Sequence, residues 1–216
     1  TKHKNLIERD VEKFNSTPRF PYAEGPRGYQ NKAYQNWVAS GKTGIFAMAT
    51  GTGKTITSLN CLLREQQIDN YYHAIIIVPT KALLKQWIEE VKHFNFTKVY
   101  PASSEFKWKE GIEQLNTSLM FDNNESFVVI TTYDTFSSDT FQKKIRAFPS
   151  STILIADEAH NIGSDRMKSV LPKLPFKRKI ALSATPKRRF DEEGNQAIEE
   201  YFNSREPYTY SFSMEK

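Results

Sequence analysis

Residues 44–55 read GIFAMATGTGKT, a short apolar stretch followed by a turn with two glycines and then by Lys54 and Thr55. The apolar stretch predicts a strand, and the residues from Lys54 onward predict a helix. A glycine-rich turn in this position is typical of a phosphate-binding loop, because glycine lets backbone N–H groups point inward around an anion. The full loop pattern has an earlier glycine where this chain has Met48, so the anion would lie against residues 51–55. A glycine turn without a ligand is the alternative.

The polar groups of this loop indicate a nucleotide with Mg²⁺ as the ligand. Lys54 would place its charge against the β- and γ-phosphates, and the Thr55 hydroxyl would bind the metal. ATP and Mg²⁺ are therefore the expected cofactors. The residues predicted to bind ATP through this loop are Thr50, Gly51, Thr52, Gly53, Lys54 and Thr55.

Around the loop, apolar stretches of strand length alternate with helical patterns. The expected strands are 44–48, 73–78, 127–131, 152–156 and 179–182, and the expected helices are 28–40, 54–66, 81–94 and 134–148. The strands are apolar on both faces, which is typical of a parallel sheet that helices cover on both sides. The sequence therefore predicts an α/β fold with a mainly parallel sheet flanked by helices on both faces. A short helix over 5–14 and a loop over 16–26 are expected ahead of it.

Two adjacent carboxylates, Asp157 and Glu158, follow directly after the strand 152–156. In open α/β sheets this end of a strand is where ligands bind. We expect Asp157 to orient Mg²⁺ and Glu158 to polarise an attacking water, with Lys54 as the third catalytic residue. A plain loop or a helix cap is the alternative reading of the pair.

Composition excludes several other classes of protein. The single cysteine cannot form an internal disulfide, and four scattered histidines do not form a zinc site. No apolar run is long enough for a membrane helix and no signal segment is visible, so a soluble, cytoplasmic protein is expected. Nine Lys or Arg residues and no acid lie between Arg166 and Phe190, which suits either contact with a polyanion or a solvated face.

Five ordered motifs resemble those of superfamily 2 helicases and translocases over about residues 20–203. The strings are Ala49–Thr55 (motif I), Asp157–His160 (motif II, a DEAH sequence), Ser183–Thr185 (motif III), 78–87 (motif Ia) and 131–135 (motif Ib/Ic), with 27–30 resembling the adenine-reading element. Within the superfamily, the likeness is greatest to restriction-enzyme-type proteins such as the helicase subunit of type III restriction enzymes. XPB-like DNA repair helicases share much of the pattern.

The resemblance implies a RecA-like first motor domain and gives roles to further residues. Gln30 would read the adenine edge, while Phe20 and Tyr22 would either pack or stack on the base. His160, Ser183 and Thr185 would couple the nucleotide to the nucleic acid, although residues 183–185 alone also suit an ordinary strand end. The residues implied to touch the nucleic-acid backbone are Pro79, Thr80, Lys81, Thr131, Thr132 and Tyr133, and Thr80 also suits a helix cap.

The same resemblance implies a division of the chain and a set of partners. Residues 1–26 would be an N-terminal helix and linker, 27–205 the motor domain, and 206–216 the start of a connection to a second motor domain. The expected nucleic-acid partner is DNA rather than RNA, and duplex DNA in particular. A nuclease or methyltransferase is a possible protein partner, and no contact with a membrane is expected. The expected function is the ATP-hydrolysing first motor domain of a restriction-type DNA helicase or translocase, weakly active alone. The alternatives are an XPB-like repair helicase and a nucleotide-dependent switch without translocation.

Overall fold

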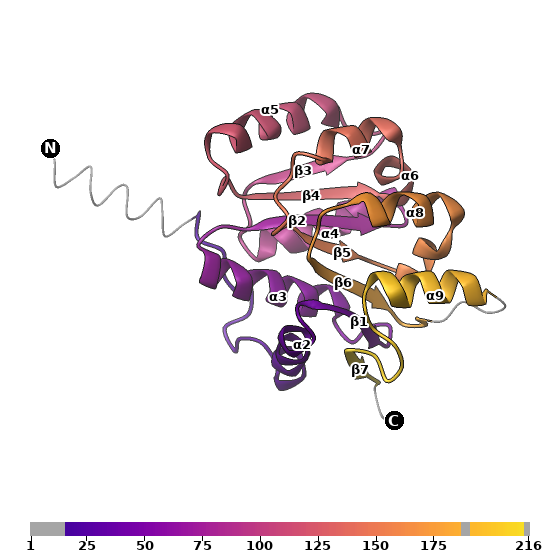
Figure 1. Cartoon of the computed structure of the whole chain (residues 1–216). Helices are drawn as coiled ribbons and strands as arrows, with labels where there is room; N and C mark the ends of the chain where they lie inside the picture. Colours follow the sequence, from indigo (N-terminus) through magenta and orange to yellow (C-terminus); the bar gives the residue numbers. More distant parts are fainter. Residues whose placement is uncertain (1–15, 187–190, 214–216) are drawn as a thin grey trace, which may run out of the picture.

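The computed structural model describes residues 16–186 and 191–213 and contains one sheet of seven strands (Figure 1). The order across the sheet is β3-β4-β2-β5-β6-β1-β7, and every strand pair in it is parallel. The strands are β1 (Thr43–Met48), β2 (His73–Val78), β3 (Val99–Ala102), β4 (Phe127–Thr132), β5 (Ile153–Ala156), β6 (Arg178–Ser183) and β7 (Tyr210–Phe212). The predicted α/β fold with a parallel sheet is confirmed.

Alternate residues of the central strands supply two separate cores. On β2, Ala74, Ile76 and Val78 belong to one core, whereas Ile75 and Ile77 belong to the other. All five side chains are fully buried, as expected for a strand that is covered on both faces. The two-sided apolar strands thus specify two helical layers.

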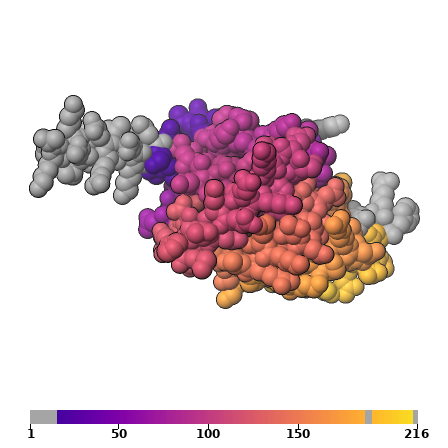
Figure 2. Space-filling model, turned by 90° about the horizontal axis from the view of Figure 1, so that it is seen from above, coloured from indigo at the N-terminus to yellow at the C-terminus, as the bar shows by residue number. Residues whose placement is uncertain are grey.

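Helices α2, α3 and α4 cover one face of the sheet, and the later helices cover the other (Figure 1). Viewed from above, the surface near the β3 edge is formed by the middle of the chain, coloured magenta to orange (Figure 2). The helices are α2 (Gly28–Ala39), α3 (Lys54–Asp69), α4 (Lys81–His93), α5 (Trp108–Phe121), α6 (Tyr133–Phe136), α7 (Asp139–Ile145), α8 (Asp165–Val170) and α9 (Glu192–Tyr201), with short 3-10 turns η1 (Ala159–Gly163) and η2 (Leu171–Lys173).

The helix expected over 134–148 is instead two short helices, α6 and α7. The side chain of Ser138 caps α7 by accepting a hydrogen bond from the Phe141 backbone N–H at 3.3 Å. Serine favours caps over helix interiors because its hydroxyl competes for backbone groups. The expectation of one continuous helix was therefore wrong at residues 137–138.

The ends of the described chain are attached to the same body. In the loop 16–26, Arg19 N donates to Phe94 O at 2.9 Å, and the Phe20 ring packs edge-on against Phe94 with centroids 5.4 Å apart. At the other end β7 pairs with β1, so the sheet continues past residue 205, where we expected a connection to begin. Whether 206–216 leads to a second motor domain stays a prediction. The helix expected over 5–14 and the basic residues 187–189 lie outside the described residues.

The basic run from Arg166 does not form one free patch in the part of the chain that the structure describes. Arg178 pairs with the buried Glu65 and with Asp69, and Lys179 donates to Tyr201 O at 2.6 Å. Lys168 pairs with two acids, one of them Glu193 at 3.0 Å. Arg178 and Lys179 begin β6, at the end of the sheet opposite the phosphate loop. No helix of the described chain has the length and apolar character needed to span a membrane.

Candidate nucleotide and metal site

The candidate residues meet at one edge of the sheet because every strand runs in the same direction. The loops after β1, β5 and β6 carry the phosphate loop, the Asp157–Glu158 pair and Ser183–Thr185, respectively. The loops after β2 and β4 carry Pro79–Thr80 and the start of α6. In the sheet order β4-β2-β5-β6-β1, the proposed nucleic-acid residues lie on one side of β5 and the phosphate loop on the other.

The phosphate loop has the backbone conformation that its glycines permit. Gly51 and Gly53 have φ values of 80° and 81°, in the left-handed region that other residues rarely adopt. Thr52 closes the turn, since its hydroxyl donates to Ala49 O at 2.6 Å. No side chain of the described residues caps the start of α3. The first backbone N–H groups of this helix are therefore available to an anion.

Lys54 lies between the loop and the acidic pair. Its Nζ is 3.4 Å from Met48 O and 4.0 Å from Glu158 Oε1. The Lys54 side chain is 11% exposed and that of Glu158 is 31% exposed. The cation and the carboxylate thus face a common space at the edge of the sheet, at a spacing that leaves them loosely paired.

Asp157 is held more firmly than its neighbour Glu158. Its carboxylate accepts one hydrogen bond from the Trp87 indole and one from the Glu158 backbone N–H, at 2.9 Å and 3.0 Å. Its carbonyl accepts from the Tyr133 hydroxyl at 2.8 Å. Burial raises the pKa of the Tyr133 hydroxyl well above 10, so it remains a donor.

Glu158 has a left-handed backbone, which is unusual for a residue with a side chain. Its φ is 47°, and Asn161 Nδ2 donates to its carbonyl at 2.8 Å. His160 Nδ1 lies 3.5 Å from Glu158 Oε2. Such a conformation costs about 1–3 kcal/mol and tends to persist at functional sites, where surrounding contacts hold it.

The oxygen ligands at this site suit an Mg²⁺ ion that a phosphate group also binds. The described residues contain no group of three His, Cys, Asp or Glu side chains able to hold a metal alone. Asp157, after β5, and Thr55, at the start of α3, offer a carboxylate and a hydroxyl as hard oxygen ligands. Mg²⁺ is commonly bound by one or two protein oxygens together with water and substrate phosphates, so this sparse set matches a nucleotide-dependent metal.

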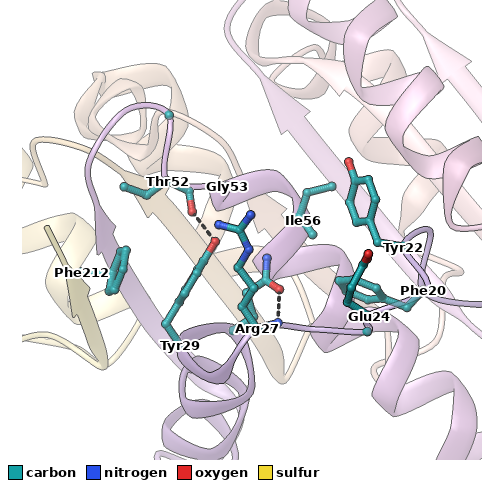
Figure 3. A pocket seen from close by; sticks show the side chains of 12 residues that line it. Phe20, Tyr22, Glu24, Arg27, Tyr29, Thr52, Gly53, Ile56 and Phe212 are labelled. Carbon is teal, nitrogen blue, oxygen red and sulfur yellow. Dashed lines mark hydrogen bonds between the residues drawn. The ribbon is translucent and has the colours of Figure 1, made fainter. Parts of the chain in front are cut away.

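A cavity of about 620 Å³ adjoins the phosphate loop, between α2, the loop 16–26 and β7 (Figure 3). Gln30 lines it, and its Oε1 accepts from Arg27 N at 2.9 Å. The Tyr29 ring stacks on Phe212 at 4.4 Å, and its hydroxyl donates to Thr52 O at 2.9 Å. The lining residues are Phe20, Tyr22, Glu24, Gly25, Arg27, Tyr29, Gln30, Gly51, Thr52, Gly53, Ile56 and Phe212. The structure thus brings Gln30 and the phosphate loop together.

The expected coupling residues show only local contacts. The Ser183 hydroxyl is buried and accepts from Thr185 N at 3.1 Å, while Thr185 is exposed. Within the described chain, no hydrogen bond joins either residue to the Asp157–His160 loop. Their role in coupling, like that of His160, stays a prediction.

The candidates for nucleic-acid contact differ in their exposure. Thr80 caps α4 by accepting from Leu83 N at 3.2 Å, as its alternative reading predicted, and it and Lys81 are exposed beside Pro79. The side chains of Thr131, Thr132 and Tyr133 are buried. These three side chains therefore do not lie open to a nucleic acid, and a contact there would need the backbone.

Three residues of this site carried no role in the sequence reading. Trp87 belongs to the motif Ia string and to an apolar helical stripe, and neither pattern predicted its contact with Asp157. Tyr29 lies within the predicted adenine-reading element 27–30 without a role of its own, and no sequence pattern predicted a role for Phe212. An indole or phenol in an otherwise apolar stripe was the available signal, because a buried N–H or O–H needs a partner.

Comparison with known proteins places the chain in a family. A family model described as "Type III restriction enzyme, res subunit" matches residues 24–188. The Chromatin-remodeling ATPase INO80 of Lodderomyces elongisporus is 31% identical over 172 residues, which are 73% of this chain and 10% of that protein. The DNA repair and recombination protein RAD54 of Oryza sativa subsp. japonica is 30% identical over 163 residues, which are 66% of this chain and 15% of that protein. The chain thus spans a small part of these relatives.

Solved structures share the fold at lower identity. The ATP-dependent Type ISP restriction-modification enzyme LlaBIII bound to DNA is 22% identical with a TM-score of 0.60, over 75% of this chain and 13% of that chain. The Sulfolobus solfataricus SWI2/SNF2 ATPase core in complex with dsDNA is 21% identical with a TM-score of 0.61, over 82% of this chain and 35% of that chain. These likenesses confirm the predicted RecA-like fold.

Proposed function

Because the chain belongs to the family described as "Type III restriction enzyme, res subunit" and is a superfamily 2 first motor domain, we propose that it binds and hydrolyses Mg-ATP as part of a motor that moves along duplex DNA. We further propose that this motor serves a restriction-type enzyme. A nuclease or methyltransferase partner, as first expected, belongs to the same proposal.

The observation that carries the proposal is the meeting of Lys54 and Glu158 at the end of the phosphate loop, with Nζ and Oε1 4.0 Å apart. Lys54 binds the β- and γ-phosphates, and Glu158 orients the water that attacks the terminal phosphate. Mg²⁺, when bound, neutralises charge on the phosphates, and Thr55 and Asp157 would hold it. Gln30 contacts the adenine in the cavity that adjoins residues 51–53 of the phosphate loop.

DNA would lie over the ends of β2 and β4, on the other side of β5 from the phosphate loop. Thr80 and Lys81 are exposed at the start of α4, where backbone N–H groups also favour an anion. The solved relatives LlaBIII and the SWI2/SNF2 core are described as bound to DNA or in complex with dsDNA, which supports this partner. Contacts of this kind would position the backbone without reading sequence.

A motor for repair or chromatin remodelling is the second candidate, because INO80 and RAD54 match the chain at 31% and 30% identity. A nucleotide-dependent switch that does not move on DNA remains the third. Stimulation of ATP hydrolysis by DNA, measured in a protein that joins this chain to the proposed second motor domain, separates a motor from a switch. Cleavage of DNA by that protein together with the proposed nuclease partner separates restriction from the other motor roles.

Binding of nucleotide to a Lys54→Ala variant tests the proposal directly. The substitution removes the side-chain charge that faces the phosphates, so ADP binding measured by calorimetry should become undetectable while the fold is kept. Lys92→Ala is the matched control, since Lys92 is an exposed lysine on α4 that pairs with Glu89 at 3.3 Å. Unchanged ADP affinity in a folded Lys54→Ala protein would contradict the site.

A further inference from the structure

Asp157 is fixed by hydrogen bonds from three other parts of the fold. Its backbone N–H donates to Ile77 O at 2.8 Å, and its carbonyl accepts from Tyr133 at the same distance. One carboxylate oxygen, Oδ2, accepts from the Trp87 indole at 2.9 Å, and the other accepts from Glu158 N. The residue is 7% exposed. Both its backbone and its carboxylate therefore have a defined orientation.

The contact from Trp87 is chemically unusual for a buried carboxylate. An indole N–H can only donate and carries no charge, so it orients the carboxylate without neutralising it. A lysine or arginine at this position would compete with a cation for the same oxygens. Each carboxylate oxygen has two acceptor positions, so the bonds from Trp87 and Glu158 N leave one on each oxygen for another ligand.

Trp87 and Tyr133 both come from segments next to the strand ends where DNA is proposed to lie. Trp87 lies on α4, whose first residue follows Thr80 at the end of β2. Tyr133 begins α6, directly after β4. Asp157 is thus connected by one hydrogen bond to each of the two helices that start at that part of the sheet edge.

We propose that Trp87 is a positioning residue that holds the Asp157 carboxylate in the orientation required to bind Mg²⁺ with the nucleotide, and that Tyr133 assists by fixing the Asp157 backbone. The inference rests on the proposed nucleotide function and adds a residue to it. Groups that orient metal ligands typically change metal affinity or activity by about 10–100-fold when removed. A purely structural role for Trp87 would instead affect folding stability and leave the metal dependence unchanged.

Trp37 provides a matched control for Trp87. Its indole donates to Lys179 O at 3.0 Å, it is fully buried, and it belongs to the same apolar core. Trp37→Phe and Trp87→Phe each remove one buried indole N–H and keep an aromatic ring. Only Trp87→Phe removes a contact with Asp157.

The test measures ADP affinity of the 216-residue protein in EDTA and across a Mg²⁺ titration. The midpoint of the titration is the Mg²⁺ concentration at which half of the Mg²⁺-dependent gain in ADP affinity is reached. In Trp87→Phe, we expect this midpoint to rise about tenfold, while the ADP affinity in EDTA stays unchanged. Trp37→Phe should keep the wild-type value, and Tyr133→Phe should show a smaller rise. An unchanged Mg²⁺ midpoint in Trp87→Phe overturns the inference alone, whereas a wild-type protein that does not bind ADP overturns the proposed function as well.

A second measurement avoids reliance on affinity. The chain has three tryptophans, so the indole N–H signals of the ¹⁵N-labelled protein are few, and the Trp87 signal is identified by its loss in Trp87→Phe. Mn²⁺ with ADP should broaden the Trp87 signal strongly and the Trp37 signal weakly, and ADP in EDTA should broaden neither. Equal broadening of the two signals would place the metal away from Asp157 and overturn the inference.

Discussion

Gln30 has two functions available to it at the level of the single residue. Its Oε1 accepts a hydrogen bond from Arg27 N, which stabilises the start of α2. The side chain also lines the cavity beside the phosphate loop, close to Gly53. A carbonyl oxygen accepts two hydrogen bonds, so the cap leaves one acceptor position and the amide donors for an adenine edge.

The two functions of Gln30 can be separated by a pair of variants. Gln30→Glu keeps the acceptor that caps α2 but removes the amide donor, whereas Gln30→Ala removes both. We expect the wild-type protein to prefer ADP over GDP by at least several-fold, since a mismatched polar group costs about 1–3 kcal/mol. Both variants should lose this preference in calorimetry, and only Gln30→Ala should also lose thermal stability. Equal affinity of the wild type for ADP and GDP would leave Gln30 with the capping function alone.

His73 is a buried histidine far from the candidate site, at the start of β2. Burial lowers its pKa to about 4, against a smaller opposing effect of the hydrogen bond between Nε2 and Glu125 O. The charges around it are Arg178, which lowers the pKa further, and Asp69 and Asp122, which raise it. The ring stacks on Phe127 at 4.7 Å, so the neutral form belongs to the core.

The folded protein should therefore lose stability as the pH falls through the range between 6.5 and 4. In that range the unfolded chain, with an ordinary histidine pKa of 6.5, binds more protons than the folded one. From His73 alone, the free energy of unfolding should be about 2 kcal/mol lower at pH 5 than at pH 8. Urea unfolding at a series of pH values should give a shallower dependence in His73→Gln by that amount. The same dependence in both proteins would contradict a low pKa.

At the scale of the elements, the sequence predicted the central strands well and the edges poorly. Strands such as 73–78 are apolar on both faces, so the burial of their side chains is enough to predict a position in the centre of the sheet. Strand β3 was missed because it is four residues long and contains Pro101, which is tolerated at a sheet edge. Helix α5 was missed although Ile112, Leu115 and Leu119 form a helical stripe that the sequence displays.

The candidate site was predictable where chemistry follows from local spacing. The phosphate loop and the acidic pair each lie in a few consecutive residues at a strand end. The contact between Trp87 and Asp157 joins residues 70 positions apart, and it depends on β2 and β5 being neighbours. Strand order is set by packing of the whole sheet, so no local pattern in the sequence encodes this pair.

The start of α4 carries an ion-pair arrangement that bears on the proposed DNA contact. Glu105, after β3, lies 3.8 Å from Lys81 Nζ and 3.0 Å from Lys85 Nζ. The hydrogen bond from Lys85 lowers the pKa of the Glu105 carboxyl, which therefore stays ionised beside both lysines. The Glu105 carboxylate thus pairs with two lysine side chains that a DNA phosphate could otherwise contact.

Removal of that charge should strengthen DNA binding. In Glu105→Gln we expect tighter binding of a short duplex by a few-fold at low salt, and a salt dependence steeper by up to about one phosphate contact. Glu89→Gln is the matched control, because Glu89 pairs with Lys92 on the exposed surface of the same helix. Fluorescence anisotropy over a salt series measures both quantities. An equal gain in the two variants would reflect net charge alone and would contradict a DNA contact at Lys81.

Over the whole molecule, the two ends of the sheet differ in how their charges are arranged. At the amino end, the buried Glu65 accepts from Lys42 at 2.6 Å, lies 3.1 Å from Arg178 and accepts from Tyr34 at 3.0 Å. This cluster joins α2, α3 and β6 and is closed within the protein. At the carboxyl end, Lys54 and Glu158 are 4.0 Å apart and partly open. Charged side chains are thus paired within the protein at the amino end, whereas the charges proposed to bind a nucleotide are partly exposed at the carboxyl end.

This openness sets the expected activity of the 216-residue chain assayed alone. Its own residues would position Mg-ATP and orient a water, but the Glu158 side chain proposed to orient that water is 31% exposed to solvent. Enzymes of this kind gain from closure that excludes water. The resemblance to superfamily 2 motors also implies that a second motor domain supplies an arginine to stabilise the transferring phosphoryl group, and in related enzymes such a residue contributes about 10³–10⁵ in rate.

We therefore expect the 216-residue protein to bind nucleotide but to hydrolyse ATP below roughly 0.1 s⁻¹, against typical enzyme turnover of about 1–10³ s⁻¹. Duplex or single-stranded DNA should accelerate it little, because coupling would require a second domain to move against this one. A steady-state phosphate-release assay measures this, with Glu158→Gln as the control for contaminating ATPase. Robust DNA-stimulated turnover that disappears in Glu158→Gln would mean that this chain, or its dimer, contains a complete catalytic site.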